Sequence, residues 1–153
     1  MTNVTVRRLR AGDALDDAYA LLVRFFREEQ FDTPDETIIA NTRRMAGIDL
    51  CGLFLAAANG DAIGVATVSI EFGIEYGYSA EMGDLYVVPE WRGRGVSRKL
   101  VVAVEDYLRA MGSPVYRVTL APYGEEAHGL SQFYSALGFE NEGRLILSKT
   151  IKG

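Results

Sequence analysis

The stretch Asp84–Leu108 constrains the fold most, because it predicts a buried strand, a tight turn and a helix in immediate succession. The run Leu85–Val88 is apolar and contains one aromatic and two β-branched residues, as a buried strand requires. Pro89 ends this strand, since proline has no N–H for a strand ladder. Beyond the turn, apolar residues recur at three- and four-residue steps on one helix face: Val96, Leu100, Val101, Val104, Leu108 and Met111.

The turn itself predicts a site for an anion. Gly93 and Gly95 allow the backbone to bend tightly and a ligand to approach it. The first N–H groups of a helix lack internal partners and carry partial positive charge, which suits phosphate. No Lys or Arg occurs between Met45 and Trp91, although the chain has a net charge of −5. Four basic residues then follow closely: Arg92, Arg94, Arg98 and Lys99. The alternative is a solvated basic helix start.

Two common phosphate-binding motifs do not fit this turn. Arg98 stands where a dinucleotide fingerprint needs its third glycine, and no Gly-Lys-Ser/Thr sequence ends a P-loop here. The remaining pattern, Arg/Gln-x-x-Gly-x-Gly/Ala at a helix start, resembles the acyl-CoA pyrophosphate loop of the GNAT family, the GCN5-related N-acetyltransferases. Ser97 departs from the usual Gly or Ala at the last position. The resemblance implies acetyl-CoA (CoA) as cofactor, bound by Arg92, Gly93, Arg94, Gly95, Val96 and Ser97.

Length and composition predict one globular domain spanning residues 1–153. Hydrophobic residues make up 48% of the chain and charged residues 24%, as in ordinary folded proteins. The single cysteine, Cys51, excludes an internal disulfide and fits a reducing compartment. No apolar run of about 18 residues and no signal peptide is evident, so we expect a cytoplasmic protein with no membrane partner. A pI of 4.9 argues against nucleic acid and favours a cationic small molecule.

Hydrophobic periodicity predicts an α/β (α+β) domain with a mixed β-sheet flanked by helices, in the order β-α-α-β-β-β-α-β-α-β-β. The segment 80–121 should form a right-handed parallel crossover. This order is also that of the GNAT fold. The predicted strands are Val4–Leu9, Cys51–Ala58, Ala62–Phe72, Ala80–Val88, Val115–Ala121, Phe139–Glu142 and Arg144–Ile151, and the predicted helices are 15–29, 34–45, 93–111 and 125–137.

The resemblance also assigns residues around the transferred acetyl group. In the family, the strand before the loop splays from its neighbour and pairs with the pantetheine arm. Carried over, this predicts cofactor contacts for Leu85, Tyr86 and Val87, with the Leu85 N–H on the thioester oxygen. The run Phe133–Phe139 resembles the second GNAT signature, whose tyrosine is proposed to protonate the departing thiolate. This tyrosine is Tyr134 here, and a core tyrosine is the alternative.

Two carboxylates before the loop are candidates for the general base. Glu81 and Asp84 are three residues apart on the fourth strand, so a regular strand directs them to opposite faces unless a bulge intervenes. Some histone-type members carry their base at the position of Glu81, and some polyamine-type members have a carboxylate at that of Asp84. A partly buried carboxylate with a raised pKa could take the proton directly or through water. The residues alone leave Glu81, Asp84 and a water chain as alternatives.

Aromatic and acidic residues gather around the end of the first predicted helix, a region that walls the acceptor cleft in the family. We expect Phe26, Glu29 and Phe31 to bind the acceptor from one side and Tyr78 from the other. Such a surface suits a polyamine, an aminoglycoside or another cationic amine. A solvated acidic segment is the alternative interpretation.

The resulting hypothesis is an acetyl-CoA-dependent N-acetyltransferase that acts on a small cationic amine by direct attack in a ternary complex. One alternative makes the acceptor a protein N-terminus or lysine. Another is a CoA-binding sensor module without catalysis, because Ala127 stands where many members have an asparagine that binds pantetheine. No metal site is predicted, and a homodimer is possible.

Overall fold

The computed structural model describes residues 3–152. Its internal contacts divide the chain into a larger unit that ends at Thr119 and a smaller unit that begins at Leu120. A single domain over residues 1–153 stays a prediction.

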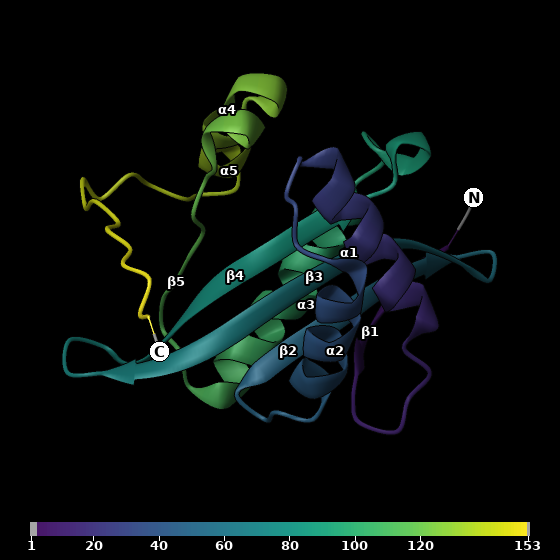
Figure 1. Ribbon diagram of the computed structural model, residues 1–153, viewed down its shortest axis with the longest axis horizontal. Helices are drawn as coiled ribbons and strands as arrows, with labels where there is room; N and C mark the ends of the chain where they lie inside the picture. The colour runs from purple at the N-terminus through teal and green to yellow at the C-terminus, as the bar shows by residue number, and fades with distance from the viewer. Residues whose placement is uncertain (1–2, 153) are drawn as a thin grey trace. The chain divides into compact units, whose positions relative to one another are not determined.

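The larger unit is built on a five-stranded sheet whose strands lie in chain order (Figure 1). The first three pairs of neighbouring strands are antiparallel, and the last pair is parallel. A tight turn at Asn59 and Gly60, both with positive φ, joins the second and third strands as predicted. The strands are β1 (Val4–Leu9), β2 (Cys51–Ala58), β3 (Asp61–Gly73), β4 (Gly77–Val87) and β5 (Tyr116–Arg117).

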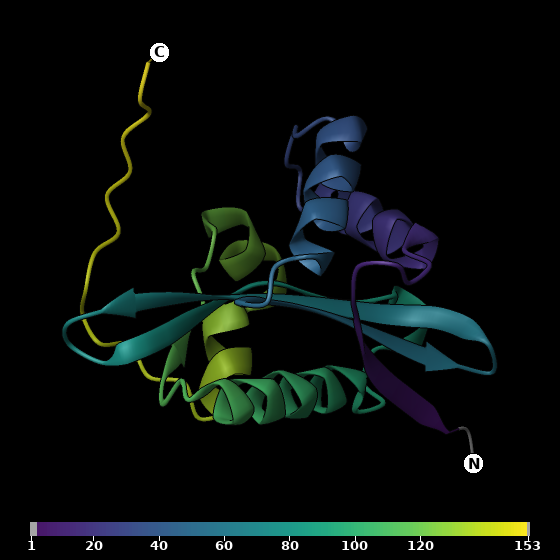
Figure 2. The same ribbon diagram turned by 90° about the horizontal axis from the view of Figure 1, so that it is seen from below.

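Helices cover both faces of this sheet. Figure 2 shows α1 (Asp16–Glu28) and α2 (Asp35–Ala46) on one face and α3 (Val96–Met111) on the other. Adjacent residues of β3, Val65 and Ala66, are therefore both fully buried, because successive side chains point to opposite, covered faces. The apolar face predicted for α3 is confirmed, since Val96, Leu100 and Val104 are almost completely buried.

The junction of β4 and α3 differs from the prediction in where the helix begins. A short 3-10 helix, η1 (Pro89–Trp91), follows β4, and α3 starts at Val96 rather than near Gly93. Gly93 and Gly95 both adopt left-handed conformations, with φ of 75° and 80°, which α-helical residues cannot have. The predicted tight glycine turn between strand and helix is confirmed. It occupies residues that the prediction placed in the first turn of the helix.

Strand lengths at the β4 edge also differ from the prediction. β3 ends at Gly73 and β4 begins at Gly77, so the turn between them has three residues instead of the predicted seven. The strand predicted over Val115–Ala121 is reduced to Tyr116–Arg117, which pairs with Ala80 and Glu81. The ladder ends there because β4 departs from regular pairing just after Glu81, where the register of β3 and β4 shifts.

The smaller unit departs most from the predicted order. The helix expected over 125–137 is two short helices, α4 (Pro122–His128) and α5 (Leu130–Ala136), separated by Gly129 with φ of 60°. The strands predicted over Phe139–Glu142 and Arg144–Ile151 are absent from the described residues 139–152. An alternating sequence does not form a strand without a ladder partner, and Leu145 and Leu147 are 88% and 91% exposed.

Candidate functional site

The turn from Arg92 to Ser97 presents a row of free backbone donors. In the described part of the chain, the N–H groups of residues 93–98 make no backbone hydrogen bond. Nothing lies within 4 Å of a Cβ built on Gly93 or Gly95, so the backbone is open to a ligand on that side. α3 follows directly and contributes its dipole. These features fit a pyrophosphate group, which needs several converging N–H donors.

The side chains of the turn lie in several directions. Arg94 stacks on the ring of Trp91, with its guanidinium carbon 4.8 Å from the ring centroid. Val96 is buried and fixes the start of α3, whereas Ser97 is half-buried. Arg92 Nε donates to the Val87 carbonyl at 2.9 Å, although the side chain is 45% exposed. The sequence predicted a phosphate contact for Arg92; its side chain bonds protein groups in the structure, and the phosphate contact stays a prediction.

Past Glu81 the edge of β4 that faces β5 is open. The last β4–β5 pair is Glu81 with Arg117, so within residues 3–152 Leu85 and Val87 have no partner strand on this side. The Val87 carbonyl accepts from Arg92, outside the ladder with β3. Because backbone groups two residues apart point to the same strand edge, those of Leu85 share this orientation. Among the described residues, the Leu85 backbone and the Val87 N–H thus lie outside the ladder, whereas the Val87 carbonyl is bonded to Arg92 and Tyr86 pairs with Val65 of β3.

A β-bulge brings Glu81 and Asp84 to the same face of the sheet. Val68 pairs with Met82 and Thr67 with Asp84, which leaves Gly83 as the extra residue. Paired residues share a face, and Ser69, the partner of Glu81, lies two residues from Thr67. The two carboxylates thus project together, as expected for a bulged rather than a regular strand.

This shared face is the one covered by α1. Tyr86 lies two residues beyond Asp84, and its ring packs 5.4 Å from that of Phe25 on α1. The opposite face carries α3, since a Cβ on Gly64 in β3 would approach Leu100 of that helix. Glu81 and Asp84 therefore lie on the α1 side of the sheet.

Asp84 is the carboxylate with the most perturbed chemistry. It is half-buried, and burial raises the pKa of its carboxyl above the usual range. A hydrogen bond from the Thr67 hydroxyl to Oδ2, at 2.5 Å, opposes this shift. Glu81 accepts a longer bond of 3.3 Å from the Thr119 hydroxyl. A carboxylate with a raised pKa is a stronger base than an ordinary aspartate, which suits proton abstraction from an amine.

The end of α1 supplies the aromatic and acidic residues predicted to bind an acceptor. The rings of Phe26 and Phe31 pack edge to face at 5.4 Å, and the Phe31 N–H bonds the Phe26 carbonyl, so the segment after α1 folds back on the helix. Glu29 is the half-buried residue that follows α1. Tyr78 pairs with Phe72, and alternation from Ser79 places it on the sheet face opposite Asp84. The structure groups Phe26, Glu29 and Phe31 but not Tyr78.

Tyr134 belongs to the smaller unit. Its half-buried ring packs between Phe133 and Phe139, at centroid distances of 5.0 and 5.3 Å. The Phe139 N–H bonds the Tyr134 carbonyl, which closes the end of α5. The aromatic signature predicted from the sequence is thus one local cluster.

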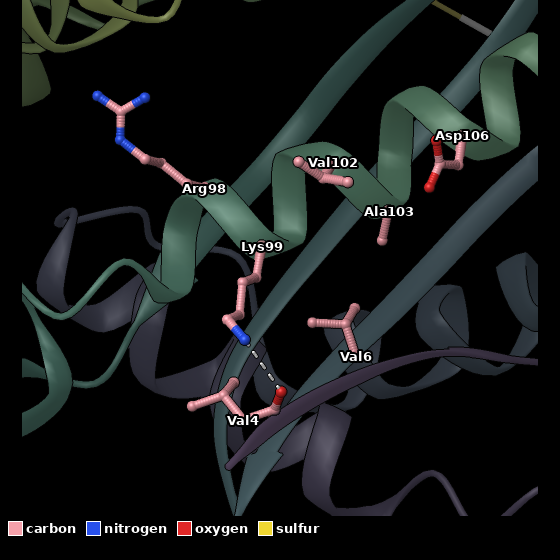
Figure 3. A pocket seen from close by; sticks show the side chains of 7 residues that line it. All are labelled: Val4, Val6, Arg98, Lys99, Val102, Ala103 and Asp106. Carbon is pink, nitrogen blue, oxygen red and sulfur yellow. Dashed lines mark hydrogen bonds between the residues drawn. The ribbon is translucent and has the colours of Figure 1, made fainter. Parts of the chain in front are cut away.

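A separate groove lies between the edge strand β1 and α3. It has a volume of about 330 Å³ and is lined by Val4, Val6, Arg98, Lys99, Val102, Ala103 and Asp106. Figure 3 shows Lys99 reaching across it to the Val4 carbonyl, at 3.5 Å, whereas Arg98 points away. The basic residues that follow the turn therefore do not all serve the turn.

Three residues of the site were not identified from the sequence. Thr67 bonds Asp84 from a neighbouring strand, and a lone threonine in a β pattern carries no signal for this role. Gly83 inside a strand is a recognised bulge signal. Glu28 bonds both Tyr86 and Arg92, a contact between residues about 60 positions apart that no local pattern could predict.

Two other general features concern the described residues only. No helix within residues 3–152 combines the length and apolar character needed to cross a bilayer. The same residues contain no group of three or more His, Cys, Asp or Glu side chains placed to hold a metal ion.

Curated proteins similar to this chain are N-acetyltransferases. The aminoglycoside N(6')-acetyltransferase type 1 of Salmonella typhimurium is 29% identical over 117 residues, which cover 74% of this chain and 79% of that protein. An uncharacterized N-acetyltransferase of Methanocaldococcus jannaschii is 29% identical over 93 residues. The match covers 60% of this chain but only 40% of the archaeal relative's length.

Solved structures share the fold over nearly the whole chain. The aminoglycoside N-acetyltransferase AAC(6')-Iy in complex with CoA superimposes with a TM-score of 0.83 at 23% identity, covering 98% of this chain and 96% of that one. The same protein in complex with the bisubstrate analogue CoA-S-monomethyl-acetylneamine gives 0.82 at 24% identity, covering 98% and 99%. At these identities the likeness establishes the fold alone.

The sheet, the open strand edge and the glycine turn define a mixed α/β transferase of the acetyl-CoA-dependent type. The family model described as Acetyltransferase (GNAT) family matches residues 15–139. The chain therefore belongs to the GNAT family and is an acetyl-CoA-dependent N-acetyltransferase that transfers acetyl to an amine. This confirms the predicted fold class, family, cofactor and enzyme class.

Proposed function

We propose that the protein acetylates a primary amine of a small polycationic acceptor of the aminoglycoside type, in a ternary complex with acetyl-CoA. The observation that carries the cofactor half of this proposal is the row of unbonded N–H groups at residues 93–98 beside the open edge of β4. The acceptor half is supported by the Salmonella relative, which is an aminoglycoside N(6')-acetyltransferase. Bound acetyl-CoA supplies the activated thioester acetyl group.

The residues of the larger unit then have distinct tasks. The N–H groups of the turn hold the pyrophosphate, and the free Leu85 N–H donates to the thioester oxygen. Asp84 removes a proton from the acceptor ammonium, because its raised pKa makes it the stronger base and it stands next to Leu85. Glu81, on the same sheet face, binds a second cationic group of the acceptor.

Further groups complete the proposal. Phe26, Glu29 and Phe31 form the acceptor wall at the end of α1, and Tyr134 donates a proton to the departing thiolate. The amine attacks the acetyl carbon directly, so no acyl-enzyme is formed. A cytoplasmic location and a homodimer stay predictions.

Isothermal titration calorimetry with acetyl-CoA tests the cofactor half. We expect wild type to bind with a Kd in the range of about 1–100 μM and Gly95→Glu to lose binding, because a carboxylate would face the pyrophosphate. Gly60→Glu is the matched control: Gly60 has φ of 82° against 80° for Gly95, and both have open space around the added Cβ. Binding retained by a folded Gly95→Glu variant would refute the assignment of the turn, and Gly60→Glu should bind as wild type does.

A CoA-release assay tests the acceptor half. The panel contains aminoglycosides, polyamines and lysine-containing peptides at equal amine concentration. We expect turnover with aminoglycosides at least tenfold above that with peptides. Turnover with peptides alone would instead favour a protein acetyltransferase, and binding of acetyl-CoA without turnover on any amine would favour a sensor module.

A further inference from the structure

The side chain of Arg92, the first residue of the turn, is committed to protein groups. Its Nε donates to the Val87 carbonyl at 2.9 Å, and one terminal nitrogen lies 3.2 Å from Oε2 of Glu28. The guanidinium carbon is 5.6 Å from the centroid of the Tyr86 ring. Its backbone N–H bonds the Pro89 carbonyl at 3.2 Å. Arg92 is thus fixed through both its backbone and its side chain.

Glu28 is the acceptor that orients this guanidinium. It is the last residue of α1, and a carboxylate there is disfavoured by the helix dipole, so its position depends on compensating partners. Oε1 accepts the Tyr86 hydroxyl at 2.9 Å and lies 3.6 Å from Arg24, while Oε2 meets Arg92. The two carboxylate oxygens therefore join α1 to the end of β4 and to the start of the turn.

From this geometry we propose that Glu28 is a positioning residue for cofactor binding: it holds Arg92 against the end of β4 and so fixes the N–H row at residues 93–98. The proposal rests on the proposed function, because it concerns the same turn. Arg92 then acts as a strut of the turn, and the backbone, rather than this side chain, provides the phosphate ligands. α1, the proposed wall of the acceptor cleft, thereby contributes to acetyl-CoA affinity without contacting acetyl-CoA.

If the contact between Glu28 and Arg92 has the opposite role, the acetyl-CoA affinity should change in the opposite direction when the contact is removed. If Arg92 were a phosphate ligand that Glu28 withholds, removing the carboxylate charge would release Arg92 and tighten binding. If Arg92 is a strut, the same change loosens the turn and weakens binding. The direction of the change in affinity therefore separates the two roles.

The test measures acetyl-CoA affinity for Glu28→Gln, Arg92→Lys and the double variant by calorimetry. Glutamine keeps the size and the hydrogen bond to Tyr86 but loses the charge, and lysine keeps the charge but lacks the two separate nitrogens with which Arg92 bonds Val87 and Glu28. We expect each single variant to weaken binding about three- to tenfold, as suits one partly exposed charged contact. The double variant should be no weaker than the worse single one, since both remove the same contact.

A kinetic readout distinguishes positioning from general stability. KM for acetyl-CoA should rise by the same factor while kcat at saturating acetyl-CoA stays within twofold, and circular dichroism confirms that the variants fold. Asp106→Asn is the matched control: it also removes one carboxylate charge and breaks an ion pair, with Arg109 at 2.9 Å, near the other end of α3. It should leave acetyl-CoA affinity unchanged.

The outcomes separate this proposal from the one on which it rests. If wild type fails to bind acetyl-CoA, the proposed function falls and this proposal with it. If wild type binds but Glu28→Gln binds equally well or more tightly, only the positioning role is overturned. Additive losses in the double variant would also overturn it, because Glu28 and Arg92 would then act independently.

Discussion

Replacing Gly64 with alanine should disturb the turn of residues 92–97 from the sheet face that α3 covers. Gly64 lies on β3, pairs with Val87, and faces the first turns of α3. A Cβ at this position would stand 3.1 Å from Leu100 Cδ1, 3.1 Å from the Tyr86 carbonyl oxygen and 3.4 Å from Val96 Cγ1. The absence of a side chain at Gly64 therefore sets how closely α3 begins against β3 and β4.

The size of the effect follows from these contacts. The two 3.1 Å approaches must open by a few tenths of an ångström, and neither neighbour yields easily, because Leu100 is fully buried and the Tyr86 oxygen is backbone. Overpacking of this kind costs about 1–3 kcal/mol. For a chain of about 150 residues each kcal/mol lowers Tm by roughly 2–4 °C. We therefore expect Gly64→Ala to lower Tm by about 2–12 °C.

Thermal unfolding by circular dichroism and acetyl-CoA titration of the folded variant test this expectation. Affinity should fall several-fold, because Val96 moves with the start of α3 and carries the N–H row with it. The control is Gly47→Ala, whose added Cβ would meet its neighbours at ordinary distances of 3.6 and 3.9 Å. An unchanged or higher Tm for Gly64→Ala, with affinity intact, would refute the argument that this glycine positions the turn.

Three further predictions concern Asp84 and Tyr134. Asp84→Asn should lower kcat by about 10²-fold or more and remove the acidic limb of the kcat/KM profile, because the wild-type base works only above its raised pKa. The same raised pKa means that the folded state binds more protons than the unfolded state. The free energy of unfolding of wild type should therefore fall as pH rises through the raised pKa of Asp84. Chemical denaturation should show this fall in wild type and its loss in Asp84→Asn. Tyr134→Phe should lower kcat by about 10²-fold with acetyl-CoA affinity unchanged, as stopped-flow and calorimetry can establish; equal kcat values would exclude Tyr134 as the acid.

The features predicted correctly from the sequence are those fixed by local chemistry. The turn at Gly93 and Gly95 follows from glycine conformations, and the buried face of α3 from apolar spacing. The break at Gly129 and the missing C-terminal strands were not predicted. Periodicity reports which side chains could be buried, but a strand also needs a partner, and the described residues 139–152 have none.

The ion pair between Arg92 and Glu28 marks another limit of sequence reasoning. A basic residue beside a phosphate-binding turn favours a phosphate contact as long as its neighbours in space are unknown. Its partner Glu28 lies on a helix that the sequence places far away, so the competing ion pair is a property of the tertiary fold. Charge near a motif therefore does not show which distant side chains compete for that charge.

One structural cause explains two features of the proposed active site. The bulge at Gly83 lies two residues beyond Glu81, whose pair with Arg117 is the last between β4 and β5. The extra residue coincides with the end of the parallel ladder, beyond which the Leu85 N–H is available for the proposed cofactor contact. It also turns Asp84 to the face of Glu81 and α1, where the acceptor is expected. In a regular strand, Asp84 would point toward α3, and the base would be on the wrong side of the sheet.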